Sequence, residues 1–167
     1  MAAIRGHAGM LLKTAGGGGG STHRYWRLYI TAPVSGSVLA IAEAEWRATA
    51  GGAALTVSAT AASSTISGSF PSSEAADGIK TDANNCWVPT ASAFPAWVSF
   101  DLGSAQTVAQ VGIWPQYDGI GDARAPLDFD VQHSDDNASW TTCDSYTGLS
   151  AGWAAGTGVG RDFAVTP

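Results

Sequence analysis

The stretch "LDFDVQHS", residues 127–134, carries the clearest structural signal in the chain, a strict two-residue period. One set of alternate positions holds Leu127, Phe129, Val131 and His133, and the other holds Asp128, Asp130 and Gln132. This alternation predicts a β-strand with one buried face and one wet face, which is typical of an antiparallel sheet.

A second strand with the same period is predicted at "YWRLYIT", residues 25–31. Trp26, Leu28 and Ile30 share one of its faces, and Tyr25, Arg27 and Tyr29 share the other. Further strands are expected at 38–48, 54–58, 97–102, 107–114, 139–143 and 161–166. The stretch "SSEAADGI" can hold one helical turn. About eight short strands joined by turns predict an all-β fold, an antiparallel β-sandwich of the jelly-roll type.

The composition indicates a folded, sparsely charged protein of 167 residues, with 45% hydrophobic and 13% charged residues. This length suits one domain, and a second would be cramped. The net charge of −6, with eight scattered Lys and Arg residues, argues against binding to nucleic acid or to an anionic membrane. Neutral sugars, or a cation such as calcium, are the partners that this charge balance favours. Seven tryptophans exceed what such a core needs, so we expect some of them on a functional surface.

Residues 1–23 are predicted to form a flexible N-terminal arm, and residues 24–167 the folded domain. The run "GGGGGS" at 16–21 has the composition of a flexible linker. We expect the arm either to dock on a neighbouring subunit or to fold back on its own domain. The opening "MAAIRGHAGMLLKTA" lacks the apolar stretch of an export signal, so we expect the protein to be made in the cytoplasm and either to stay there or to leave inside something larger.

Cys86 and Cys143 are the two cysteines of the chain. They cannot form a metal site by themselves. Free buried thiols are favoured over a disulfide between them, although the pairing stays open.

Three segments carry a family signal by their order and spacing. They are "EAADGIKTDANNCW" at 74–87, "PAWVSFDLGSAQTVAQVGIW" at 95–114 and "DFDVQHSDDNASWTT" at 128–142. Together they resemble the discoidin family, also called the coagulation-factor type C domain. The matching features are an Ala-x-Asp-Gly loop that leads to a Trp, an aromatic strand that ends Asp-Leu-Gly, and a Ser-x-Asp-x-x-x-Trp turn. The resemblance implies the galactose-binding-like jelly roll.

The strands "RYWRLYIT" at 24–31 and "AIAEAEWRA" at 40–48 would close such a domain in the family, yet here they come first. The chain stops at "GRDFAVTP", where the family would continue into them. We interpret this order as a circular permutation, which is tolerated where the strands that begin and end a fold lie close together. We therefore expect residues 25–47 to pair, within one sandwich, with the strand that finishes at Val165.

A Gly-rich arm in front of this permuted pattern is similar to structural proteins of tailed bacteriophages. That resemblance implies a virion protein of the tail, neck or capsid decoration, whose arm binds other virion proteins and which is oligomeric within the assembly. Host-surface carbohydrate is the expected ligand. Two alternatives stay open: a purely structural subunit whose aromatic loops contact other virion proteins, and a stand-alone bacterial carbohydrate-binding module.

The family resemblance also implies a structural calcium ion, held by loop oxygens near the Asp-Gly motif and by a Glu of the closing strand. By position, its ligands are Glu43, Asp77, and a second loop oxygen from Asp82 or Asn85. Calcium takes six to eight oxygen ligands, which suits such a loop. The alternative is that Glu43 caps a loop or faces water, and that Asp77-Gly78 is only a turn.

The loop "WPQYDGIGDARAP", residues 114–126, is the expected carbohydrate site, because it combines aromatic rings with polar side chains. Its candidate residues are Trp114, Gln116, Tyr117, Asp118 and Arg124, with Asp122 beside them and Trp153 as a second loose ring nearby. These rings bind a sugar, contact another subunit or plug the end of the sandwich. The core or its rim is expected to hold Trp26, Trp46, Trp87, Trp97 and Trp140.

Catalysis has little support in the sequence. His7, His23 and His133 are isolated, and His133 falls on the inward face of its strand, where a core histidine is expected. The acids of "DFDVQHSDD" fall on a wet face and a turn, where they aid solubility. We expect a non-enzymatic protein.

Overall fold

The computed structural model describes residues 20–154 and 156–167, and the predictions for residues 1–19 of the arm lie outside the described residues. The described part of the chain holds eight strands and one short 3-10 helix. These are β1 (His23–Pro33), β2 (Ile41–Arg47), β3 (Ala59–Ala62), η1 (Ser72–Ala76), β4 (Ala96–Gln106), β5 (Gln110–Pro115), β6 (Pro126–Ser134), β7 (Thr141–Tyr146) and β8 (Arg161–Ala164). None of the described residues belongs to a helix long and apolar enough to span a membrane.

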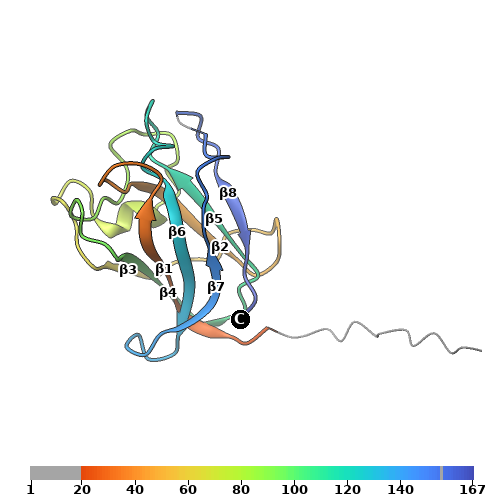
Figure 1. Cartoon of the computed structure of the whole chain (residues 1–167). Helices are drawn as coiled ribbons and strands as arrows, with labels where there is room; N and C mark the ends of the chain where they lie inside the picture. The colour runs from red at the N-terminus through yellow and green to blue at the C-terminus, as the bar shows by residue number, and fades with distance from the viewer. Residues whose placement is uncertain (1–19, 155) are drawn as a thin grey trace, which may run out of the picture.

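The strands form two antiparallel sheets that together make a β-sandwich (Figure 1). One sheet has the order β3-β4-β1-β6-β7, and the other has the order β2-β5-β8. The predicted all-β sandwich is confirmed, as is the helical turn at "SSEAADGI".

The prediction of a strand at 54–58 is wrong, because the edge strand β3 begins only after this range, at Ala59. Leu55 and Val57 are instead half-buried loop residues that pack against the core. Their apolar alternation therefore reflects two side chains turned inward from a loop rather than a strand of the sheet.

The core lies between the two sheets and follows the predicted two-residue period. Trp26, Leu28 and Ile30 of β1 are fully buried. The ring of Trp26 lies 5.7 Å from that of Trp46, which lies 5.4 Å from that of Phe100. The inward faces of β1 and β2 thus meet across the sandwich as expected.

The two described histidines are not isolated, which corrects the prediction made for them. His133 is only half-buried, at the end of β6, and its ring stacks on that of His23 with the centroids 3.6 Å apart. Pairing of β1 with β6 brings the two rings together, although they are far apart in the sequence.

The chain order is consistent with a circular permutation, but one expected pairing is wrong. β8 pairs with β5, and β5 pairs with β2, so β8 shares a sheet with β2 without being its neighbour. β1 belongs to the other sheet, between β4 and β6. The two ends of the described chain meet, because a Cβ placed on Gly20 would lie 3.5 Å from the ring of Pro167 (Figure 1). Adjacent ends are what a permuted order requires.

Both cysteines are free thiols, Cys86 buried and Cys143 half-buried. Burial raises the pKa of each thiol to about 12, which keeps both protonated at neutral pH.

Candidate functional site

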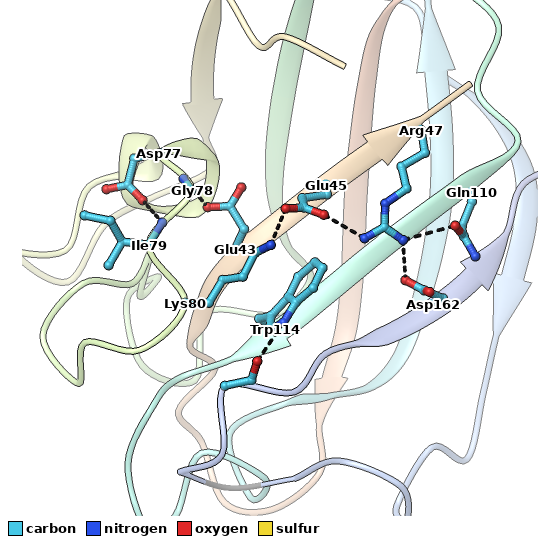
Figure 2. Close-up of polar contacts among 11 residues, drawn as sticks. Glu43, Glu45, Arg47, Asp77, Gly78, Ile79, Lys80, Gln110, Trp114 and Asp162 are labelled. Atoms are coloured by element: carbon cyan, nitrogen blue, oxygen red, sulfur yellow. Dashed lines mark hydrogen bonds and ion pairs between the residues drawn. The ribbon is translucent and has the colours of Figure 1, made fainter. Parts of the chain in front are cut away.

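Glu43 is a buried acid on β2, covered by the loop that follows η1. Its Oε2 accepts a hydrogen bond of 2.8 Å from the backbone N–H of Gly78 (Figure 2). Only 4% of the residue is exposed. This burial raises the pKa of the carboxyl to about 7, although the hydrogen bond from Gly78 acts in the opposite direction. The negative charge of Glu43 is therefore unfavourable unless a cation or a proton compensates it.

Asp77 directly precedes Gly78 on the loop that covers this carboxylate, and Asn85 lies farther along the same loop. Asp77 accepts hydrogen bonds from the N–H of Ile79 (2.9 Å) and from Nδ2 of Asn85 (2.8 Å). The other amide atom, Asn85 Oδ1, is buried and has no hydrogen-bond partner among the described residues. Asp82 accepts from the N–H of Asn84 at 2.8 Å and so closes its own turn.

Of the four predicted metal ligands, Asp77 and Asn85 are hydrogen-bonded to each other, and Glu43 accepts from Gly78, the residue after Asp77. Two carboxylates and an amide oxygen without a donor fit a hard cation such as calcium, which prefers oxygen ligands. Within residues 20–154 and 156–167, no three His, Cys, Asp or Glu side chains form a metal-binding group. The fit therefore depends on the unpaired oxygen of Asn85.

Trp114 stands at the end of β5, as predicted, but its ring is not free, because only 9% of the residue is exposed. The indole lies across two glycines: an added Cβ would come within 2.8 Å of it at Gly112 and 2.6 Å at Gly160. Its Nε1 donates to the carbonyl of Gly158 (3.1 Å), and Lys80 Nζ lies 4.0 Å from the ring centroid. The expectation of a spare ring at this position is wrong, since the glycines create a slot that holds it.

Charged residues surround this ring on the outer side of the three-stranded sheet (Figure 2). Glu45 accepts hydrogen bonds from Lys80 and from Nη2 of Arg47, the latter at 2.6 Å. Arg47 Nη1 also donates to Asp162 (2.7 Å) and to Gln110 (3.1 Å). Burial alone would raise the pKa of Glu45, but its two cationic partners lower it below the usual range. We call this surface, made of Glu45, Arg47, Lys80 and Asp162, the paired face.

The polar residues of the predicted sugar loop are also brought together, but they bind one another. Gln116 is 8% exposed, and its Nε2 donates to the carbonyl of Ala83 at 2.7 Å. Its Oε1 accepts from Arg124 Nη1 at 2.5 Å, and the same Nη1 lies 3.1 Å from Asp118 Oδ2. The loop is therefore held in one shape by its own side chains.

Three loops meet at this end of the sandwich: 77–85, 116–124, and the described residues of 153–154 and 156–160. The bond from Gln116 to Ala83 joins the first two, and the bond from Trp114 of β5 to Gly158 ties the third to the sheet. We call this region the loop end. Its half-exposed ring is Tyr117, which directly precedes Asp118.

Trp153 is half-buried rather than loose. Its Nε1 donates to the carbonyl of Leu149 (2.9 Å), and its ring lies 5.9 Å from that of Phe163. It packs against the core from the side, which corrects its expected role as a free aromatic.

A cluster on the outer side of the five-stranded sheet was not predicted. Because the alternate residues of β1 fill the core, Arg27 points outward. Its Cζ lies 4.3 Å from the ring centroid of Trp140, 5.2 Å from that of Tyr29 and 5.7 Å from that of Trp97. All three rings are half-buried. Trp97 and Trp140 therefore contact Arg27 outside the sandwich rather than the core. We call these four residues the Arg27 face.

Two polar residues are buried beneath this cluster. Ser99 and Gln132 pair with Arg27 across the sheet, and they are only 4% and 8% exposed although they face outward. Gln132 Oε1 accepts from Arg27 Nε at 2.6 Å. The sequence signal was two tyrosines and an arginine on the outward face of β1. The two tryptophans come from distant parts of the chain, Trp97 from β4 and Trp140 from the turn before β7.

Comparison with known proteins places this site in a family. The family model described as the NedA-like, galactose-binding domain, of the F5/F8 type C class, matches residues 74–159, just over half of the chain. No curated protein and no solved structure was similar enough to count as a match. The matched range includes most of the loop end and four of the strands, and the two antiparallel sheets agree with it. The chain therefore belongs to the galactose-binding F5/F8 type C family.

Proposed function

We propose that the chain is a non-enzymatic carbohydrate-binding domain and that the loop end contacts the sugar. The observation that carries this proposal is the half-exposed ring of Tyr117 beside the fixed Asp118–Arg124 pair, in a chain of the galactose-binding family. An aromatic face suits the C–H groups of a pyranose, and an ion pair held in place can orient its hydroxyls. Because three loops hold this group rigid, little ordering would be needed on binding.

Binding to an array of neutral galactosides tests this proposal. We expect Tyr117→Ala to lower the affinity by about tenfold or less, the size of one aromatic contact. Ile66→Ala removes an exposed hydrophobic side chain outside both the loop end and the Arg27 face, and it should leave the affinity unchanged. Unchanged binding by Tyr117→Ala, or no binding by the wild type, would remove the sugar from the loop end.

A second candidate function is a contact with another protein subunit at the same place. Each of the three loops carries one exposed aliphatic residue: Ile79, Ile120 and Val159 are 45%, 52% and 58% exposed. Aliphatic side chains suit a protein surface better than a sugar. If this candidate function holds, the triple variant Ile79→Ser, Ile120→Ser and Val159→Ser should lose its binding to the other subunit. It should still bind galactosides.

We further propose that the domain is carried on a bacteriophage virion, where the sugar would belong to the host surface. The support is the arm before β1 and the permuted strand order, which resemble phage structural proteins. Deletion of residues 1–22 should leave the sandwich folded and prevent incorporation into particles. A truncated chain that assembles normally would contradict the role of the arm.

Calcium is proposed as a structural ion of the loop 77–85, with Glu43, Asp77 and Asn85 Oδ1 as ligands. The ion would neutralise the buried carboxylate of Glu43 and give the unpaired amide oxygen a partner. Chelation should lower the melting temperature of the wild type. An unchanged melting curve would take the metal out of this proposal.

A further inference from the structure

The Arg27 face is a second surface with the makeup of a binding site, and it lies on a sheet rather than at the loop end. A hollow of about 210 Å³ lies next to it on the same sheet, lined among others by Ser99, the cross-strand partner of Arg27, and by Asp101, which pairs with Arg24. The Arg27 face itself combines a cation with three aromatic rings.

Arg27 has no carboxylate partner. The ion pairs of the described arginines join Arg24 to Asp101, Arg47 to Glu45 and Asp162, and Arg124 to Asp118. All 14 Asp and Glu residues lie within the described part of the chain, and none of them pairs with Arg27. The acids on the two neighbouring rows of the sheet have partners of their own: Asp130 accepts a hydrogen bond of 2.6 Å from Ser145, and Asp101 pairs with Arg24 at 2.8 Å.

Most donors of this guanidinium are also unused. An arginine has five N–H donors, and Arg27 uses the one on Nε for Gln132. Within the described residues, its Nη atoms make no hydrogen bond. Arg161 also lies over aromatic rings, but its Nη1 donates to the carbonyl of Ala151 at 2.7 Å. Partial burial lowers the pKa of Arg27, as expected for a cation without a carboxylate beside it.

The lack of a carboxylate partner on Arg27 indicates which kind of ligand would suit this face. A carboxylate matches the planar fork of a guanidinium with two parallel hydrogen bonds. The surrounding rings of Trp97 and Trp140 suit the C–H face of a sugar. We propose that the Arg27 face binds an acidic saccharide, with its carboxylate on Arg27 and its ring against one of these tryptophans. This site is independent of the proposed function of the loop end.

A pair of ligands that differ only in charge tests this proposal: trigalacturonate and its methyl ester, titrated calorimetrically into the full chain. The acid should bind about tenfold more tightly than the ester, the size of one charge-assisted pair in a partly exposed site. Arg27→Gln should abolish this difference. Arg27→Lys keeps the positive charge but lacks the planar guanidinium, so this variant should retain only part of the difference in affinity between acid and ester. Arg161→Gln, which removes one charge from an arginine on other rings, should bind like the wild type.

The indole N–H signals of the seven tryptophans locate the ligand on the unmodified chain, so the test does not depend on any variant folding. We expect the signals of Trp97 and Trp140 to move with added acid. Equal affinity for acid and ester, no binding of the acid, or an equal loss in Arg161→Gln would overturn the proposal. Shifts confined to Trp114 and Trp153 would also overturn it and would place the ligand at the loop end.

Discussion

Arg47 and Arg27 lie on the outer sides of the two sheets, and each has its guanidinium over a tryptophan. The Cζ of Arg47 lies 5.7 Å from the ring centroid of Trp114, and that of Arg27 lies 4.3 Å from the ring of Trp140. Arg47 also binds two carboxylates, whereas Arg27 binds only the amide of Gln132. The paired face is thus neutralised within the chain, and the Arg27 face is not.

This difference teaches that residue types alone do not identify a binding surface. Both faces combine arginine with aromatic rings, but the paired face uses these groups to hold its own strands and the loop 77–85 together. A cation whose donors remain unused has capacity for a partner from outside.

We expect the largest effect on stability at Gly160, where the lack of a side chain makes room for the ring of Trp114. In Gly160→Ala the new Cβ would lie 2.6 Å from the ring of Trp114 and 2.9 Å from the carbonyl oxygen of Ile113, so Trp114 must leave its slot. We expect a loss of about 3 kcal/mol in the free energy of unfolding, measured with denaturant. Gly119→Ala, with no described atom within 4 Å of its Cβ, is the control. Equal stability of the two variants would show that Trp114 is not clamped.

Glu43 is the exception on the strand of the paired face, because no cation binds its carboxylate. Its folded-state pKa of about 7 lies above the ordinary value of 4.5, so the folded chain holds a proton that the unfolded chain releases. Stability without calcium should therefore fall as the pH rises from 4.5 to 7. Glu43→Gln should abolish this fall and stabilise the chelated protein at pH 8 by about 2 kcal/mol.

At pH 8, added calcium should make the wild type more stable than Glu43→Gln, which is the reverse of their order under chelation. The wild type should gain stability from the ion, and Glu43→Gln should not, because it lacks one carboxylate ligand. Matching pH profiles for the two chelated proteins would contradict the uncompensated burial of Glu43.

We expect the smallest effect on stability when the same substitution is made at each of the two arginines. Arg47→Gln leaves Glu45 and Asp162 with one partner fewer, whereas Arg27→Gln leaves no carboxylate unpaired. We expect Arg47→Gln to lose about 1 kcal/mol more than Arg27→Gln, a value reduced for the partial exposure of the pairs. High salt should narrow this gap, since it screens the carboxylates left behind. A larger loss for Arg27→Gln would reverse the comparison.

Most of the fold could be predicted from local sequence patterns because the strands that fill the core carry their own period. The alternation of Trp26, Leu28 and Ile30 was enough to place β1 in the core. The contact between loop 77–85 and β2 was also predictable in outline, since family order placed Glu43 near the Asp77-Gly78 turn. What failed at 54–58 was a short apolar pattern that a loop and a strand share.

The site could not be predicted in detail because its contacts cross between strands. The slot of Trp114 needs Gly160, which reaches it through the pairing of β5 with β8. The Arg27 face needs Trp97 from β4 and Trp140 from the turn before β7. Sheet register decides such meetings, and no local pattern encodes them.

The central claim is that one sheet face is complete within the chain and the other is open to an anionic partner. The affinity of trigalacturonate for Arg27→Gln and Arg47→Gln, measured side by side, tests it most directly. The account predicts about a tenfold loss for Arg27→Gln and the wild-type value for Arg47→Gln. Equal affinities in the two variants would contradict it.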